Sequence, residues 1–271
     1  MRKSAIEKLK NRFPKGSVID LKTLNRFIDE ELESLNPKSK PFAIFDLTRK
    51  NIIYQLSSDK YKVSSRKTYR SEPPLVVLPA LTDVSLLYPE LEICVWELKS
   101  LNQFLEMQFL KTLIFVEVEK GFESLVLERL SQDKQFNILL KPNIKQMESF
   151  MNIDSTIILK TLIYKAPTHK KRFTKKVGFN QNYHGDKSSL STPKIEKIIV
   201  DLFVDPLLYI IDDAQRDLIF RNILGEYAVN FKTLLSYARS RNKKETIKEY
   251  IEQCLGFDID TGEFYDQREK L

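Results

Sequence analysis

An aspartate and a Glu-x-Lys pair in the first half of the chain have the types and order of residues that could do chemistry. Asp83 precedes Glu97 and Lys99, which is the D…E-x-K order of Mg²⁺-dependent nucleases. In a strand, residues i and i+2 lie on the same face, so Glu97 and Lys99 could flank one metal ion, and Glu117 on the next strand could join them. Because such a pair also arises by chance in a chain with 30% charged residues, we keep this nuclease as the alternative interpretation.

Apart from that pair, the sequence shows no pattern typical of catalysis or of a bound cofactor. It contains no glycine-rich phosphate loop and no nucleophile elbow. His169 and His184 have no cysteine or second histidine at ligand spacing, and Cys94 and Cys254 are too few for a disulfide framework. No apolar run approaches the roughly 20 residues of a membrane-spanning helix. We therefore expect a cytoplasmic protein that is not an enzyme and holds neither a metal nor a cofactor.

Positive charge is concentrated at the N-terminal end of the chain. The 271 residues have a formal net charge of +7. Residues 1–70 carry 17 Lys+Arg against 8 Asp+Glu, or +9, whereas residues 71–271 carry 27 against 29, or −2. This asymmetry is typical of a nucleic-acid-binding module joined to a partner domain. The alternatives are a generally basic surface, which would spread the excess evenly, and an adaptor whose N-terminal module binds protein.

The pattern of residues 1–70 predicts three helices and then a hairpin. The helices are predicted over residues 2–13, 20–34 and 39–49. Two strands are predicted over residues 53–55 and 61–63, joined by a turn at 57–59. Asp20 caps the second helix, and Phe42 and Phe45 pack inward from the third. This is the order of a winged helix-turn-helix, in which the third helix enters the major groove and the hairpin rests on the DNA backbone.

The basic residues of this region fall where a winged helix would touch DNA. The predicted base contacts are Ser39, Lys40 and Thr48, on the third helix. Lysines and arginines around that helix, on the hairpin and after it are expected to neutralise phosphates. They are Lys38, Arg49, Lys50, Lys60, Lys62, Arg66, Lys67 and Arg70. We expect backbone contacts to supply most of the affinity, although each single lysine, taken alone, could equally be a solvated side chain.

A stiff Glu72-Pro73-Pro74 segment separates a first domain, residues 1–70, from a second, residues 71–271. In the second domain, strand-like apolar runs alternate with amphipathic segments, which predicts an α/β (α+β) fold with a mixed sheet. The scaffold could be restriction-endonuclease-like without the chemistry. The domain should end in a bundle of helices over 213–225, 230–241 and 243–255 and a frayed acidic tail from Asp258. Residues 165–191 carry a net charge of +6; they form a long hairpin or loop, either solvated or a second contact surface.

Residues 192–205 are the most clearly predicted helix. Thr192 can cap it and Pro193 can open it, because the first position of a helix needs no N–H. Its apolar residues form one stripe, consisting of Ile195, Ile198, Ile199, Leu202 and Phe203. Its charged residues lie on the other face, where we expect solvent; they are Lys194, Glu196, Lys197 and Asp201.

Two motifs in the C-terminal half are similar to those of a known family. The first, P-x-x-E-K-x-x-V-D, comprises Pro193, Glu196, Lys197, Val200 and Asp201. The second, Y-A-x-x-R, comprises Tyr237, Ala238 and Arg241, with Arg239 between them. Together with the runs VWELKSLNQFLEMQ and LIFVEVEKGFE, they resemble the AbiEi-type antitoxins and related transcriptional regulators of bacterial abortive-infection systems. The resemblance covers most of residues 38–252, and the long basic segment 165–191 departs from it.

The resemblance implies a type IV antitoxin with a winged helix-turn-helix and a C-terminal α/β domain. Such a protein represses its own operon by binding inverted repeats in double-stranded DNA. It also counters a nucleotidyltransferase-like toxin encoded beside it, in phage defence, without a need for a stable complex. The resemblance implies no catalytic residue. The candidate positions for the antitoxic effect are Glu196, Lys197, Asp201, Tyr237, Arg239 and Arg241, and each could equally be a structural ion pair or hydrogen bond.

Overall fold

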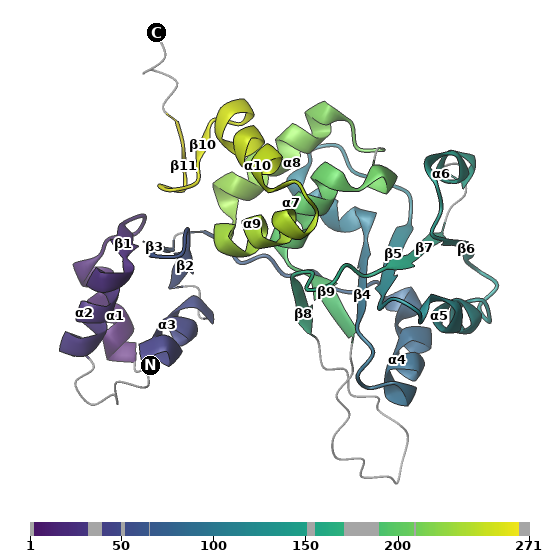
Figure 1. Cartoon of the computed structure of the whole chain (residues 1–271), viewed down its shortest axis with the longest axis horizontal. Coiled ribbons are helices and arrows are strands. Elements are labelled where there is room, and N and C mark those ends of the chain that lie inside the picture. Colours follow the sequence, from purple (N-terminus) through teal and green to yellow (C-terminus); the bar gives the residue numbers. More distant parts are fainter. Residues whose placement is uncertain are drawn as a thin grey trace. The chain divides into compact units, whose positions relative to one another are not determined.

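The computed structural model describes residues 3–31, 40–49, 52–64, 66–150, 155–170, 190–208 and 210–265 (Figure 1). It confirms a mixed α/β protein. Lys38, Ser39 and Lys50 lie outside the described residues, as do most of the basic segment and the side chain of Arg49. By its internal contacts the chain divides into two units, one with residues 1–69 and 220–271 and the other with residues 70–219. The first unit therefore includes C-terminal elements as well as N-terminal ones.

The first unit begins with a small module, residues 3–64, which we call the N-terminal module. Its elements are α1 (Lys3–Arg12), β1 (Val18–Asp20), α2 (Leu21–Glu31), α3 (Lys40–Arg49), β2 (Ile53–Gln55) and β3 (Lys60–Val63). Strand β3 pairs antiparallel with both of the others, which gives the sheet order β1-β3-β2. Asp20 caps α2 as predicted, since its Oδ1 accepts a hydrogen bond from the Thr23 backbone N–H at 2.8 Å. That bond is the main reason why the pKa of Asp20 is lowered.

The core of the N-terminal module shows that one part of our prediction for α3 is wrong. Leu24 and Ile28 of α2 are buried, but Phe42 and Phe45 of α3, which were predicted to pack inward, point outward and are 64% and 58% exposed. The inward positions of α3 are instead Ala43, Asp46 and Leu47, which follow one another at helical spacing. The apolar run of α3 covers almost every side of the helix, so the pattern alone could not select the buried side.

The C-terminal part of the first unit is helical and then ends in a hairpin. Its elements are α8 (Asp213–Glu226), which crosses the division between the units, α9 (Phe231–Ser240), α10 (Lys244–Glu249), a π-helical turn (Tyr250–Cys254), β10 (Phe257–Asp258) and β11 (Glu263–Phe264). These helices confirm the three predicted ones. Asn230 caps α9 by accepting a hydrogen bond from the Thr233 N–H at 2.9 Å. The predicted frayed tail from Asp258 is wrong over its first residues, because β10 and β11 pair antiparallel.

The second unit is built on a mixed sheet of six strands, with the order β6-β7-β5-β4-β9-β8. Its elements are α4 (Leu78–Leu87), β4 (Ile93–Glu97), β5 (Leu113–Val118), α5 (Glu123–Leu130), β6 (Asn137–Leu140), α6 (Ile144–Phe150), β7 (Thr156–Thr161), β8 (Thr168–Lys170), β9 (Leu190–Pro193) and α7 (Ile195–Val204). Strands β5, β7 and β6 are parallel to one another, and β4 runs antiparallel to β5 and parallel to β9. Within the described ranges, none of the helices combines the length and apolar character needed to cross a bilayer.

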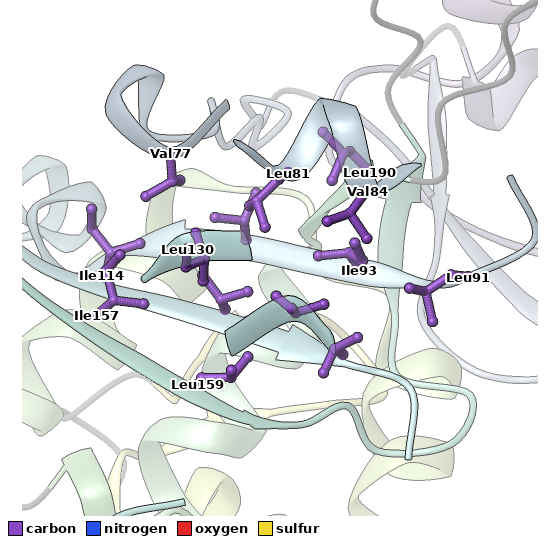
Figure 2. Packing of buried hydrophobic residues seen from close by; sticks show 14 residues of the cluster. Val77, Leu81, Val84, Leu91, Ile93, Ile114, Leu130, Ile157, Leu159 and Leu190 are labelled. Atoms are coloured by element: carbon purple, nitrogen blue, oxygen red, sulfur yellow. The ribbon is translucent and has the colours of Figure 1, made fainter. Parts of the chain in front are cut away.

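The two faces of this sheet have different chemistry. One face packs under α4 and α5 in an apolar cluster, in which Ile114, Ile157 and Leu159 of the sheet meet Leu81 and Val84 of α4 (Figure 2). Because successive side chains of a strand alternate between faces, the residues between these positions point to the opposite face. That opposite face is covered by α7 and carries charge.

Candidate functional site

A row of polar side chains crosses the middle of the sheet on the face covered by α7. In the strand register, Ser191 of β9 pairs with Cys94 of β4, Cys94 with Glu117 of β5, and Glu117 with Lys160 of β7. All four therefore lie side by side on neighbouring strands. The next row on this face is aromatic, and Trp96 stacks on Phe115 with ring centroids 4.4 Å apart.

Helix α7 adds its charges to this row, which contradicts our prediction that they face solvent. Lys197 is 1% exposed and Asp201 2% exposed, and Glu196 is also buried. Lys197 Nζ donates to Glu117 Oε1 at 2.7 Å and to Asp201 Oδ2 at 2.5 Å. The helix is buried on both its apolar and its charged side. It also begins later than predicted, at Ile195, because residues 190–193 form β9.

Glu117 is the centre of this charge cluster. Its Oε1 accepts a hydrogen bond from Trp96 Nε1 at 3.1 Å, and Lys160 Nζ lies 3.7 Å away. Burial alone would raise the pKa of Glu117, but the ammonium groups of Lys160 and Lys197 and the hydrogen bonds outweigh it, and the pKa is lowered. Burial likewise opposes the charge of Lys160, yet Glu117 and Asp205 raise its pKa. Both groups are therefore held charged inside the protein.

The cluster, which we call the α7 charge cluster, consists of Glu117, Lys160, Lys197, Asp201 and Asp205. Two ammonium groups face three carboxylates, which leaves one negative charge in excess. Its outer end is the ion pair of Lys160 with Asp205. There it borders an open hollow of about 710 Å³, lined also by residues 141–145 and by Pro206 and Leu207.

Two groups near the cluster have pKa values that burial or hydrogen bonding shifts strongly. The Cys94 thiol is fully buried, and this burial raises its pKa to about 12, so it remains protonated and unreactive. Glu123 at the start of α5 accepts hydrogen bonds from Lys141 and Thr161, which lower its pKa to about 2 although burial opposes the shift. Glu123 thus ties α5 to β7 and to the lysine that lines the hollow.

The residues of the nuclease alternative do not come together in the way that chemistry requires. Asp83 lies in α4 and forms an ion pair with Arg129. Lys99 follows β4 and donates to the Thr112 hydroxyl at 3.0 Å. Among the described residues, no three histidine, cysteine or acidic side chains are grouped so that they could hold a metal ion. Glu97 and Glu117 therefore do not form a metal site with Asp83.

The second motif lies on α9 in the first unit. Tyr237 and Ala238 are buried, whereas Arg239 is exposed. Arg239 lines a hollow of about 460 Å³ together with Lys232, Lys244 and Lys248, and with Ser57 and Ser58 of the β2–β3 turn. Arg241 follows the helix as its C-cap residue. The two motifs of the predicted antitoxin set therefore lie in different units, with Lys197 and Asp201 buried and Arg239 at the surface.

The predicted DNA contacts of the N-terminal module differ in how accessible they are. Lys40 forms an ion pair with Asp29 at 2.6 Å, and the Thr48 hydroxyl donates to the Ile44 carbonyl at 2.9 Å. Lys60 is 40% exposed in its side chain and lies 3.6 Å from Asp260. Lys67 is paired with Glu226 at 2.6 Å, and Arg70 is exposed.

Lys62 and Arg66 are covered by the β10–β11 hairpin, which sequence reasoning missed. Lys62 Nζ donates to the carbonyls of Thr261 at 2.8 Å and Gly262 at 3.2 Å, and it pairs with Glu263. Arg66 donates to the same Gly262 carbonyl at 2.6 Å. Lys62 is only 3% exposed. The acidic residues Asp260 and Glu263, which pair with Lys60 and with Lys62, were the signal in the sequence for basic partners.

The fold and these clusters define a mixed α/β protein of two units, with a buried charge cluster under α7 and a small helix-and-hairpin module at the N-terminus. The chain belongs to the family of unknown function DUF6577, whose model matches residues 41–256. The match begins inside α3 and ends in the segment after α10, so it includes both motifs. No curated protein matches the chain.

Proposed function

We propose that the protein is a DNA-binding transcriptional regulator of the antitoxin type and that its N-terminal module is a winged helix-turn-helix. The observation that carries the proposal is the order α1-β1-α2-α3-β2-β3 with the sheet β1-β3-β2. In a winged helix, a short strand after the first helix pairs with the hairpin that follows the third helix. The pair α2–α3 then corresponds to the helix-turn-helix and the β2–β3 turn to the wing.

The charge of the same region supports duplex DNA as the partner. Residues 1–70 carry an excess of nine positive charges, and phosphate contacts depend on such an excess. Lys60, at the start of β3, keeps an accessible side chain next to the wing turn. Lys62 does not, because the hairpin bonds its ammonium group. Phosphate contacts are therefore expected from Lys60 rather than from Lys62.

Binding of duplex DNA at several salt concentrations tests this proposal. Fluorescein-labelled duplexes from the region upstream of the gene are titrated with the full-length protein and with two variants, Lys60→Ala and Lys134→Ala. Lys134 is an exposed lysine of the second unit and serves as the control. Loss of one phosphate contact lowers the slope of log K against log salt by about one unit. We expect that loss for Lys60→Ala alone, and an absence of binding at low salt would contradict the proposal.

The antitoxin part of the proposal rests on the two sequence motifs that resemble the AbiEi-type family. It states that the protein opposes a nucleotidyltransferase-like toxin encoded beside it and represses the shared operon through inverted repeats. Co-expression of the full-length protein with the neighbouring gene product should restore growth. The full-length chain is needed because residues 220–271 belong to the same unit as residues 1–69. An Arg239→Ala variant, altered at the exposed motif position, should protect less than the Lys134→Ala control.

A further inference from the structure

Helix α3 exposes an aromatic pair instead of the polar residues expected on a DNA-reading surface. Phe42 and Phe45 are the two most exposed phenylalanines among the described residues, at 64% and 58%. They are one turn apart on the helix, and their ring centroids lie 6.4 Å apart with the planes inclined by 38°. The two rings therefore form one continuous apolar surface next to Pro41, which is also exposed.

Two of the three side chains predicted to read bases, Lys40 and Thr48, are described by the structure, and both are engaged within the module. The Lys40 ammonium is held by Asp29, and the Thr48 hydroxyl donates to the Ile44 carbonyl. Among the described side chains of α3, the rings of Phe42 and Phe45 are therefore the large groups that remain exposed. In the major groove, the one apolar feature of a base pair is the C5 methyl group of thymine, and phenylalanine is among the residues that contact it.

We infer that Phe42 and Phe45 read thymine methyl groups in the major groove and so select the DNA sequence. This inference rests on the proposed function, since it takes α3 to be the helix that enters the groove. The centroid separation of 6.4 Å is close to two steps of about 3.4 Å along one DNA strand. The two contacted thymines are therefore expected within two base steps of each other.

The net positive charge of residues 1–70 favours DNA over a second protein surface as the partner of the two rings. An apolar surface that docks another copy of the chain or a protein partner does not require the nine excess positive charges of residues 1–70. Rings that contact base edges do require them, because phosphate contacts position the helix in the groove. Docking of a second copy is kept as an outcome of the test.

The experiment removes the methyl groups without changing base pairing. Duplexes tiled across the region upstream of the gene are first screened to find the bound segment, and each thymine in it is then replaced by deoxyuridine. Removing one buried CH₂-sized group costs about 0.8 kcal/mol, so we expect about fourfold weaker binding for each contacted thymine. The double variant Phe42→Ala and Phe45→Ala should bind the thymine and deoxyuridine duplexes equally. Tyr164→Ala, which removes an exposed ring of the second unit, should keep the wild-type preference.

The outcomes separate the inference from the function on which it rests. A duplex that is bound equally well with thymine or deoxyuridine at every position overturns the inference and leaves DNA binding intact. Failure to bind any duplex overturns the proposed function as well. A wild-type protein that is dimeric in light scattering and becomes monomeric in the double variant assigns the rings to a second copy, which also overturns the inference. Circular dichroism of the double variant should match the wild type, because both rings lie outside the core.

Discussion

Replacement of Lys197 by methionine should strongly destabilise the second unit. Lys197 is shared by Glu117 and Asp201, and the α7 charge cluster holds two ammonium groups against three carboxylates. The substitution removes one of the two cations and changes the excess from one negative charge to two. Removing one partner of a buried ion pair costs about 3–5 kcal/mol. We expect a loss of that size, which corresponds to an equilibrium constant for unfolding roughly 10² to 4 × 10³ times larger.

Urea unfolding followed by tryptophan fluorescence measures this loss at the site itself. Trp96 is the single tryptophan of the chain, and its indole N–H donates to Glu117. Because Trp96 is 1% exposed in the folded protein, its emission should shift to longer wavelength when the second unit unfolds. The midpoint and slope of the transition give the free energy of unfolding for each variant.

Asp201→Asn is the matched control, because it brings the cluster to equal numbers of positive and negative groups. Its amide oxygen can still accept a hydrogen bond from Lys197, so we expect a smaller loss, about 1–2 kcal/mol. The reasoning is refuted if Lys197→Met unfolds within about 1 kcal/mol of the wild type, or if Asp201→Asn is the more costly change. Either result would mean that the cluster does not act as a coupled, buried set of charges.

Three further predictions concern other contacts. Lys62→Met should lower the melting temperature in calorimetry, because the Lys62 ammonium group is bonded to the C-terminal hairpin. For the same reason it should leave the salt dependence of DNA binding unchanged. A change of about one unit in the slope of log K against log salt would show that the hairpin separates from Lys62 when DNA binds. The Glu123 carboxylate has its pKa lowered from 4.5 to about 2, so it stabilises the fold above pH 4.5, and this stabilisation is lost as the pH falls to about 2. The free energy of unfolding of Glu123→Gln should therefore depend less on pH over this range than that of the wild type. An equal pH dependence of the two proteins would contradict the lowered pKa. Gly262→Ala should cost about 1 kcal/mol in thermal unfolding, because its φ is +69° and a Cβ would lie 2.9 Å from Leu56, whereas the helical Gly225→Ala should not destabilise.

The elements with regular periodicity could be predicted from the sequence. The predicted alternation of strand and helix between residues 113 and 161 and the three predicted helices after residue 213 are confirmed. The buried side of α3 could not be predicted in this way. Its apolar residues surround the helix, and its inward face contains Asp46, which is 3% exposed.

The charges of α7 could not be placed from local pattern at all. Lys197 is buried because Glu117 receives it, and that partner lies 80 residues earlier in the chain. Periodicity within one helix assigns charged residues to solvent, because it contains no information about partners on another strand. The same reason applies to Lys62, whose hairpin partners lie about 200 residues later. Pairs of opposite charge that lie far apart along the chain are therefore the part of the candidate site that could not be predicted from the sequence.

The separation of Lys62 from its hairpin has a consequence for the newly made chain. At 5–20 residues per second, translation takes roughly 10–40 s to reach the hairpin after Lys62 has been synthesised. During that interval the Lys62 ammonium group lacks its carbonyl acceptors. A ribosome-bound chain thus presents a more positive surface than the finished protein. Nascent chains should adhere to polyanions more strongly than the completed molecule does.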